Sequence, residues 1–521
     1  MKELTFHRWF LPWVERWPDS PGYADLDQPL RTYSQHTDRV FRLASAARKE
    51  LGVQPGDRVA VMACNSTAFM ELYHASYLGA FVLNPLNLRF APKELEFVLA
   101  DSETKVVFVD FMFAGVIDQV RGATSVEKVV LIGEPTGDPP HDVRYDDLLA
   151  AGDAVEPVEP EESDPCLLMY TGGTTGTPKG VLVSQRAEIL NAVHTRFAFP
   201  MDEGQITMVL TPMFHAASMG FVVNPQQGRV PVHIMPLFDP GKAIAAIEQY
   251  GVTFTAAVPT MLGMMVNHPT FATEKLATIE NLGYGASPMP APLLAQLQEK
   301  LPGVGFIQGY GMTEASAMLT ALNADDHRRG GDLLRSAGRA LPGIRLSIQD
   351  PDGNKLPQGE TGEVCAQGGN FMDSYWRREE ATAEVFRDGW YHTGDAGYLD
   401  PEGYLFLVDR VKDMIVTGGE NVYCAEVENA IGSHPAVLQV AVIGIPDDRW
   451  GEAVHAIVVL KDGATVTEQE LIDHAREHIA GYKVPKSVSF REEPLPLSGA
   501  MKVLKRDLRA PFWEGRERAV N

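Results

Sequence analysis

Helical and extended patterns alternate along the first part of this 521-residue chain, and this alternation constrains its fold more than any other feature. Residues Ser34 to Leu51 carry apolar side chains at helical spacing, and Arg58 to Ala63 form a short apolar run that suits a buried strand. A helical stretch from Pro92 to Leu99 and a second strand-like run from Thr104 to Val109 follow. The alternation predicts βαβ units around a parallel or mixed sheet, and therefore an α/β fold.

The length predicts more than one domain, because single cores rarely grow beyond roughly 250 to 300 residues. After Asp409 a polar stretch is followed by about a hundred residues with strand and helix patterns of their own, at Leu438 to Ile443 and Glu468 to Ile479. We therefore expect a large N-terminal domain of several subdomains, residues 1–409, and a small, mobile α+β domain, residues 410–521. The acidic, proline-containing run from Glu156 to Pro165 is expected to be a surface connection.

Charge and composition exclude several classes of protein. A formal net charge of −24 opposes binding to nucleic acid, whose affinity for proteins comes mainly from clustered Lys and Arg. The four cysteines are dozens of residues apart, which predicts neither a metal site nor a disulfide framework and fits a reducing cytoplasm. No segment has the ~20 apolar residues of a membrane helix, and the N-terminus lacks a signal-peptide pattern. Peripheral membrane contact and a homodimer stay open as partner expectations.

The segment from Tyr170 to Gly180 combines glycines, threonines and one lysine after a strand-like run from Cys166 to Tyr170. Glycine lets a backbone approach a phosphate closely, threonine hydroxyls donate hydrogen bonds, and Lys179 brings a positive charge to a polyanion. The segment is not a Walker A loop, because Pro178 precedes the lysine and Gly180 follows it. It predicts a phosphate-binding loop of another kind.

This loop resembles the signature loop of the adenylate-forming superfamily, which includes acyl-CoA and aryl-CoA synthetases, luciferases and the adenylation domains of peptide synthetases. Further segments match that family in its order: Gly309–Glu314, Tyr391–Asp395, Asp409–Asp413, Gly418–Tyr423 and a lysine near the C-terminus. The resemblance spans about Thr32 to Arg509. It implies an acyl-CoA ligase that uses ATP and Mg²⁺ to form an acyl-adenylate and pyrophosphate, and then transfers the acyl group to coenzyme A.

The resemblance also implies a role for each matching residue. The catalytic residues would be Lys502, Lys179, Glu314 and Thr171, of which Glu314 and Thr171 would hold Mg²⁺. The nucleotide would contact Thr171, Gly172, Thr174, Thr175, Lys179, Gly285, Ala286, Ser287, Gln308, Gly309, Tyr310, Gly311, Met312, Thr313, Asp395, Arg410 and Lys502. Lys412 would be the hinge of the C-terminal domain, and Gly418 and Gly419 would border the coenzyme A channel.

The acid itself is expected to be apolar. His215, as an aromatic gate rather than a base, and the bulky Tyr284 and Met312 are candidates for the acyl pocket. A medium- or long-chain fatty acid is the first choice, an aryl or phenylpropenoic acid the second, and a carrier protein is an alternative acceptor to coenzyme A. One departure stands out, since Met501 occupies the position before the catalytic lysine where the family usually has glycine.

Overall fold

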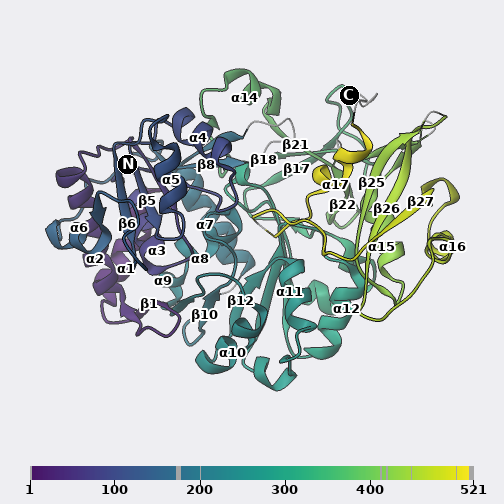
Figure 1. The fold of residues 1–521 in the computed structure, drawn as a ribbon, viewed down its shortest axis with the longest axis horizontal. Coiled ribbons are helices and arrows are strands. Elements are labelled where there is room, and N and C mark those ends of the chain that lie inside the picture. The colour runs from purple at the N-terminus through teal and green to yellow at the C-terminus, as the bar shows by residue number, and fades with distance from the viewer. Residues whose placement is uncertain are drawn as a thin grey trace.

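The computed structural model describes residues 3–171, 178–199, 201–410, 414–417, 420–447, 449–499 and 501–514. Four β-sheets and the helices around them make up this part of the chain. Figure 1 shows a broad N-terminal body and, on its right, a smaller C-terminal lobe that contains β25, β26, β27, α15 and α16. The predicted α/β class is confirmed.

The first large sheet has eight strands in the order β19-β9-β8-β4-β3-β5-β6-β7. Pairs among β3 to β8 are parallel, whereas β8 with β9 and β9 with β19 are antiparallel. The strands are β3 (Arg58–Met62), β4 (Val82–Pro85), β5 (Val106–Asp110), β6 (Lys128–Ile132), β7 (Val143–Arg144), β8 (Pro165–Thr171), β9 (Lys179–Ser184) and β19 (Ser374–Tyr375). The strands predicted near residues 58, 104 and 166 are confirmed as β3, β5 and β8.

The second large sheet has nine strands in the order β16-β15-β14-β13-β12-β10-β11-β1-β2. Its central pairs are parallel, and both edges end in antiparallel pairs. The strands are β1 (Pro21–Asp25), β2 (Arg31–Thr32), β10 (Thr207–Val209), β11 (Val232–Ile234), β12 (Phe254–Ala257), β13 (Asn281–Gly285), β14 (Gly305–Tyr310), β15 (Thr320–Leu322) and β16 (Arg339–Ala340).

Two five-stranded sheets follow in sequence. The third sheet is antiparallel and consists of β17 (Arg345–Gln349), β18 (Gly362–Gln367), β20 (Phe386–Arg387), β21 (Trp390–Leu399) and β22 (Leu405–Arg410). The fourth consists of β23 (Ile415–Thr417), β24 (Glu420–Val422), β25 (Val437–Asp447), β26 (Gly451–Leu460) and β27 (Ser487–Arg491). The predicted domain boundary at residues 409 and 410 lies at the end of β22, and a separate motion of the C-terminal part stays a prediction.

Helices cover both faces of the two large sheets. Those of the body are α1 (Phe6–Arg16), α2 (Tyr33–Glu50), α3 (Thr67–Tyr77), α4 (Pro92–Asp101), α5 (Ala114–Arg121), α6 (Tyr145–Ala151), α7 (Gln185–Ala198), α8 (Met219–Val223), α9 (Pro225–Gly228), α10 (Pro240–Tyr250), α11 (Pro259–Val266), α12 (Ala291–Lys300), α13 (Ala324–Arg329) and α14 (Glu379–Val385). The C-terminal part adds α15 (Cys424–Gly432), α16 (Glu468–His478) and α17 (Lys505–Arg509). The helices predicted at residues 34–51, 92–99 and 468–479 are confirmed as α2, α4 and α16.

Apolar clusters explain how these layers hold together. A central cluster joins both large sheets through α2, α3, α7 and α8, and all eleven residues of α3 are buried. A helix that is buried on every side must lie between layers rather than on a surface. An outer cluster packs α10, α11 and α12 against the opposite face of the nine-stranded sheet, and another packs α4 and α5 against the eight-stranded sheet. The body is therefore a five-layer stack of helices and sheets.

The acidic connection predicted between residues 156 and 165 has a specific structural task. The Glu159 carboxylate accepts hydrogen bonds from the Thr5 hydroxyl and the Arg8 guanidinium, at 2.9 and 2.9 Å. The Glu162 carboxylate accepts two backbone N–H groups, those of Glu3 and Leu4. These acidic side chains attach helix α1 to the body, which the sequence pattern did not indicate.

The four cysteines, Cys64, Cys166, Cys365 and Cys424, are all free and buried, as the absence of a disulfide pattern predicted. Among the described residues, no helix is both long and apolar enough to span a bilayer.

Glu188 on α7 gives the body a measurable dependence on pH. Its side chain is buried and accepts hydrogen bonds from Tyr77 and Asn191, and burial raises the pKa of its carboxyl to about 7. Between the ordinary carboxyl pKa and pH 7 the folded protein holds a proton that the unfolded chain releases, so the free energy of unfolding falls as the pH rises through this window.

We expect Glu188→Gln to remove this loss, because the amide stays neutral at every pH. At pH 8 the free energy of unfolding of the variant should exceed that of the wild type by up to about 3 kcal/mol. Near pH 4.5 the two free energies should be alike. Urea unfolding at both pH values measures the difference. The exposed Glu50 provides the control, and an equal effect of Glu50→Gln would contradict the assignment.

Candidate active site

The hairpin of β8 and β9 places two predicted phosphate-binding residues opposite each other. Thr171 ends β8, Lys179 begins β9, and the two are register partners across the antiparallel pair. The Thr171 hydroxyl donates to the Lys179 backbone oxygen at 3.5 Å. Residues 172–177, with the predicted ligands Gly172, Thr174 and Thr175, lie outside the described part of the chain.

Tyr375 connects Lys179 to Glu314. The Lys179 Nζ atom lies 5.1 Å from the centre of the Tyr375 ring, and the Tyr375 hydroxyl donates to Glu314 Oε1 at 2.9 Å. The ring face attracts the cation while the hydroxyl holds the carboxylate. No local sequence pattern marks Tyr375, because β19 reaches the edge of β9 only through the sheet.

The carboxyl ends of β13 and β14 lie side by side because these strands are parallel neighbours. This brings the predicted nucleotide-binding segments 285–287 and 308–313 to the same edge of the sheet. Gly311 follows β14 in a tight loop, where an added Cβ would lie 1.8 Å from the backbone oxygen of Ala317. Glycine is therefore required there, and the loop continues into a short 3₁₀ helix, η3 (Thr313–Ala315), which carries Glu314.

Asp395 on β21 is bonded to Tyr310 at the end of β14. The Tyr310 hydroxyl donates to Asp395 Oδ2 at 2.7 Å, and the Asp395 backbone N–H donates to the Thr393 hydroxyl at 3.1 Å. Both side chains are buried. The third sheet thereby joins the nine-stranded sheet at the site. Arg410 is the register partner of Asp395 across β21 and β22, and its side chain lies outside the described atoms.

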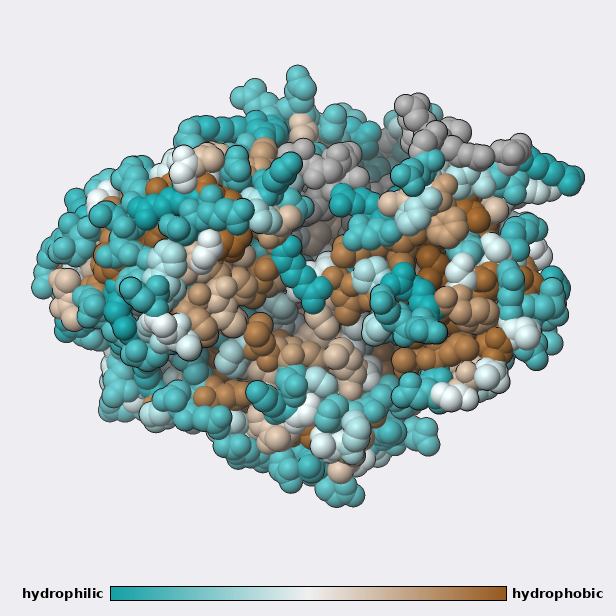
Figure 2. All heavy atoms as spheres, in the orientation of Figure 1, coloured by the Kyte–Doolittle hydropathy of each residue, from teal (hydrophilic) through white to brown (hydrophobic). Residues whose placement is uncertain are grey.

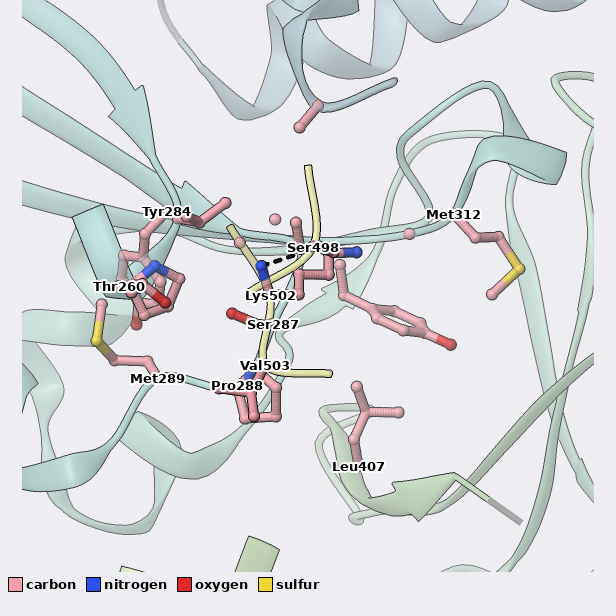
Figure 3. Close-up of a pocket in the computed structure, with 18 of the residues that line it drawn as sticks. Thr260, Tyr284, Ser287, Pro288, Met289, Met312, Leu407, Ser498, Lys502 and Val503 are labelled. Atoms are coloured by element: carbon pink, nitrogen blue, oxygen red, sulfur yellow. Dashed lines mark hydrogen bonds between the residues drawn. The ribbon is translucent and has the colours of Figure 1, made fainter. Parts of the chain in front are cut away.

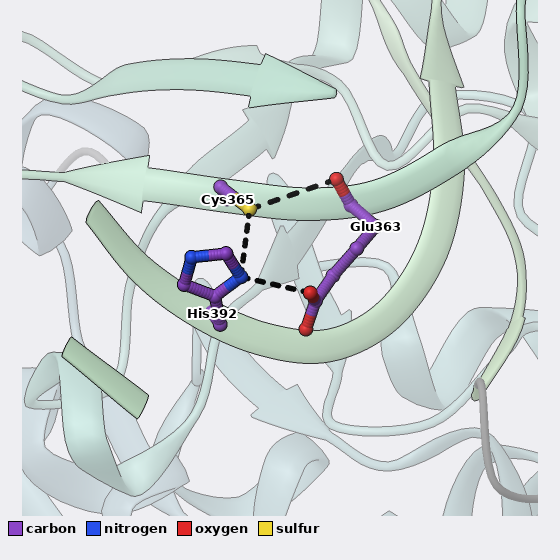
Figure 4. Close-up of side chains that lie close together, drawn as sticks. All are labelled: Glu363, Cys365 and His392. Atoms are coloured by element: carbon purple, nitrogen blue, oxygen red, sulfur yellow. Dashed lines mark hydrogen bonds and ion pairs between the residues drawn. The ribbon is translucent and has the colours of Figure 1, made fainter. Parts of the chain in front are cut away.

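Near Asp395, Glu363 forms a bonded group with Cys365 and His392 (Figure 4), and Arg387 contacts the same group. Glu363 Oε2 lies 2.8 Å from His392 Nδ1, and Glu363 Oε1 accepts the backbone N–H of Gly394 at 3.1 Å. The Arg387 guanidinium lies 2.7 Å from the same His392 nitrogen, and burial raises the pKa of the Cys365 thiol to about 12. Arg387 places a cation against this group, and Glu363 holds the turn before Asp395.

Lys502 enters the cleft from the C-terminal part of the chain. Its backbone N–H donates to the Ser498 hydroxyl at 3.1 Å, as Figure 3 shows beside Thr260 and Tyr284. Burial, together with the charge of Lys502, lowers the pKa of His215 to about 3. Because His215 Nδ1 accepts the Ala217 backbone N–H at 3.1 Å, the imidazole is neutral and carries its proton on Nε2.

One cavity of about 2460 Å³ contains the described candidate residues. Figure 2 shows this face of the molecule hollowed between the body and the C-terminal lobe. The predicted residues that line it are Thr171, Lys179, His215, Tyr284, Gly285, Ala286, Ser287, Gln308, Gly309, Tyr310, Gly311, Met312, Thr313, Glu314, Asp395 and Lys502. Residues 412, 418 and 419, predicted as hinge and channel, lie outside the described part. The tertiary structure thus brings together residues that are up to 331 positions apart in sequence.

Three phenylalanines gather on the wall of this cavity. Phe254 has its ring centre 5.9 Å from that of Phe199 and 5.7 Å from that of Phe221. The Phe199 ring also lies against Gly309, where an added Cβ would lie 3.2 Å from it. No local sequence pattern marks these three residues, because they come from separate elements. The predicted pocket residue Tyr284 borders the cavity, but its hydroxyl is bonded to His327 at 2.8 Å and to Gln308 at 3.3 Å.

Comparison with known protein families gives two matches along this chain. A family model described as AMP-binding enzyme matches residues 10–376, and a second, described as AMP-binding enzyme C-terminal domain, matches residues 426–502.

Curated relatives and solved structures extend the similarity over nearly the whole chain. A feruloyl-CoA synthase from Amycolatopsis is 39% identical over 92% of this chain and 94% of its own length. A long-chain-fatty-acid–CoA ligase from Mycobacterium tuberculosis is 37% identical over 95% of this chain and 96% of its own. The structure of ATP-bound MatB from Rhodopseudomonas palustris superposes with a TM-score of 0.88 at 28% identity, covering 98% of this chain and 99% of that one.

Gly311→Ala should destabilise the body by about 1 to 3 kcal/mol, since the new methyl group meets a backbone oxygen that can move only with its loop. Thermal unfolding should show a lower Tm for the variant. Gly303→Ala is the matched control, because a Cβ at that exposed position meets no atom within 4 Å. An unchanged Tm for Gly311→Ala would contradict the close approach.

Proposed function

Since this chain belongs to the AMP-binding enzyme family and is an ATP-dependent acid–CoA ligase, we propose that it activates an apolar, ring-bearing carboxylic acid as its adenylate and transfers the acyl group to coenzyme A. The observation that carries the proposal is the convergence of Lys179, Glu314, Asp395 and Lys502 on one cavity. Each comes from a different structural segment, so their meeting is a property of the tertiary fold.

The first half-reaction requires an oxygen of the substrate carboxylate to attack the α-phosphorus of ATP while the bond to pyrophosphate breaks. Negative charge builds up on the transferring and leaving oxygens, and fixed cations stabilise it best in a site that excludes water. We assign Lys179 to the leaving phosphates and Lys502 to the carboxylate and α-phosphate. Asp395 would accept hydrogen bonds from the ribose hydroxyls, an assignment supported by its place beside Tyr310 at the strand ends.

The residues present also fit a magnesium ion. Glu314 and Thr171 offer hard oxygen ligands, the type that Mg²⁺ prefers, and the Tyr375 hydroxyl holds Glu314 through its Oε1 atom. When bound, the ion would neutralise charge on the triphosphate. Tyr375 would orient Glu314 for this task and limit the movement of Lys179.

The neutral His215 supports a role as a gate between nucleotide and acid rather than as a base. With its proton on Nε2, the imidazole can donate one hydrogen bond toward the substrate carboxylate. A pKa of about 3 leaves it unprotonated across the physiological range, so its contribution should not change between pH 6 and 9.

In the second half-reaction the thiol of coenzyme A attacks the acyl carbon, and AMP leaves. Because Lys502 lies inside the cleft, a thiol could reach the adenylate by the same side only after the C-terminal part moves. We therefore propose Lys412 as the hinge, Gly418 and Gly419 as channel residues, and residues 410–521 as the moving domain. Coenzyme A is the proposed acceptor, with a carrier protein as the alternative.

The aromatic wall favours a planar acid over a long flexible chain. Phe199, Phe221 and Phe254 line the cavity with their rings packed on one another, and an aromatic surface of this kind suits an aromatic partner. An aryl or phenylpropenoic acid is accordingly proposed as the preferred substrate, ahead of the fatty acid that the sequence alone favoured. A cytoplasmic location, peripheral membrane contact and a homodimer stay predictions.

Lys502→Ala should slow pyrophosphate release by about 100-fold or more, since it removes a cation aimed at developing charge. Thioester formation from supplied acyl-adenylate should stay near the wild-type rate. The exposed Lys486→Ala is the control and should affect neither step. Equal loss of both half-reactions in Lys502→Ala would count against a lysine that serves adenylation alone.

Pyrophosphate release across a panel of acids, with and without coenzyme A, tests the reaction and its substrate class together. The wild type should show a higher kcat/KM for phenylpropenoic acids than for C12 to C16 fatty acids. Phe199→Ala should lower kcat/KM for the aryl acids by about tenfold, because it removes one ring contact. Phe197→Ala, two positions away on the exposed face of α7, is the control. A wild-type preference for fatty acids would overturn the substrate assignment.

A further inference from the structure

Met501, directly before Lys502, has a left-handed backbone conformation with φ of 60°. Residues other than glycine disfavour this conformation by a factor of about 5 to 30, because the Cβ approaches the following carbonyl. Methionine has none of the local hydrogen bonding that lets Asn or Asp tolerate it. An unfavourable backbone conformation beside a cavity lysine calls for a compensating contact.

The backbone of Met501 sets the direction of Lys502 within a tight turn. We call residues 497–499 and 501–503 the lysine loop. The Met501 backbone N–H donates to the Ser498 backbone oxygen at 2.9 Å, and the Ser498 backbone N–H donates to the Lys502 backbone oxygen at 2.7 Å. Leu497 and Val503 form an isolated β-bridge that closes the loop. A change of φ at Met501 would therefore turn Lys502 away.

The compensating contacts come from the body. The Thr260 hydroxyl, in the first turn of α11, donates to the Met501 backbone oxygen at 3.0 Å. The Met501 side chain packs against the outer cluster, whose members include Met261 and Leu262 of the same helix. A glycine at this position would adopt the backbone conformation freely but would make no apolar contact with the body.

We propose that Met501 and Thr260 form a latch that holds the lysine loop on the body, so that both are positioning residues for Lys502 in adenylation. The apolar contact and the hydrogen bond act at one point of the loop, and both are broken when the C-terminal part moves away. The latch therefore stabilises the adenylation arrangement relative to the thioester-forming one. This inference rests on the proposed two-step function.

The test compares Met501→Ala, Met501→Gly and Met501→Leu in the full-length protein. Met501→Ala loses the packing and keeps the unfavourable backbone, so adenylation should slow about tenfold. Met501→Gly loses the packing but relaxes the backbone, and should slow adenylation less than Met501→Ala does. Met501→Leu should restore most of the rate. Thioester formation from supplied acyl-adenylate should stay within about twofold of the wild type for all three.

Thr260→Val should also slow adenylation selectively, with recovery in Thr260→Ser. The matched control is Thr273→Val, because the Thr273 hydroxyl also donates to a backbone oxygen, that of Lys300, away from the lysine loop. Adenylation in Met501→Gly at or above the wild-type rate would overturn the latch. So would equal slowing of both half-reactions in the Met501 or Thr260 variants.

Hydrogen exchange measures how firmly the latch holds the lysine loop, without catalytic turnover. In the unliganded protein, the backbone amides of the lysine loop should exchange faster in Met501→Ala and Thr260→Val than in the wild type. In Thr273→Val they should exchange at the wild-type rate. If the wild type released no pyrophosphate with any acid, the proposed function would fail while this measurement still decided the latch. Equal exchange in wild type and Met501→Ala would refute it.

Discussion

The contact between the Tyr375 ring, the Lys179 ammonium and the Glu314 carboxylate is the one on which the site depends. It ties the edge of the eight-stranded sheet to the loop that leaves the nine-stranded sheet, with a hydroxyl–carboxylate distance of 2.9 Å. A cation and an anion are held apart by an aromatic ring instead of neutralising each other in a salt bridge. This arrangement suits the proposed contacts of Lys179 with phosphate and of Glu314 with a metal ion.

The surrounding layers make this separation stable. Helix α3 is buried on every side between the two sheets, and its Glu71 carboxylate is bonded to Arg39, Arg31 and the Tyr145 hydroxyl. A core that satisfies its buried charge locally does not compete for the cations of the cleft. The third sheet contributes Asp395 through its bond to Tyr310, and Glu363 fixes the turn before it. Glu314 and Asp395 thus each have a structural partner behind them.

The positively charged lysines of the cleft belong to a chain whose formal net charge is −24. ATP and an acid are both anions, so the overall field of the protein opposes their approach, and local cations must outweigh it at short range. Lys179 belongs to the body, whereas Lys502 belongs to the C-terminal part. In the proposed two-step reaction, a cation carried on a separate segment would let the same cavity stabilise adenylyl transfer and later admit a thiol.

The sequence by itself determined the α/β class and the local elements such as α2, β3 and α16, and it supplied the candidate residues of the nucleotide site, because hydrophobic periodicity and short glycine-rich motifs are local properties. Only the tertiary structure decided which distant segments meet at the candidate site. Several side chains contact segments that are distant in sequence, and no local pattern distinguishes such a side chain from an ordinary core residue. They are Tyr375, Phe199, Phe221, Phe254 and Thr260. The same holds for Met501, which in sequence is only a departure from a motif. Its left-handed backbone and its contact with the body exist because the chain folds back on itself.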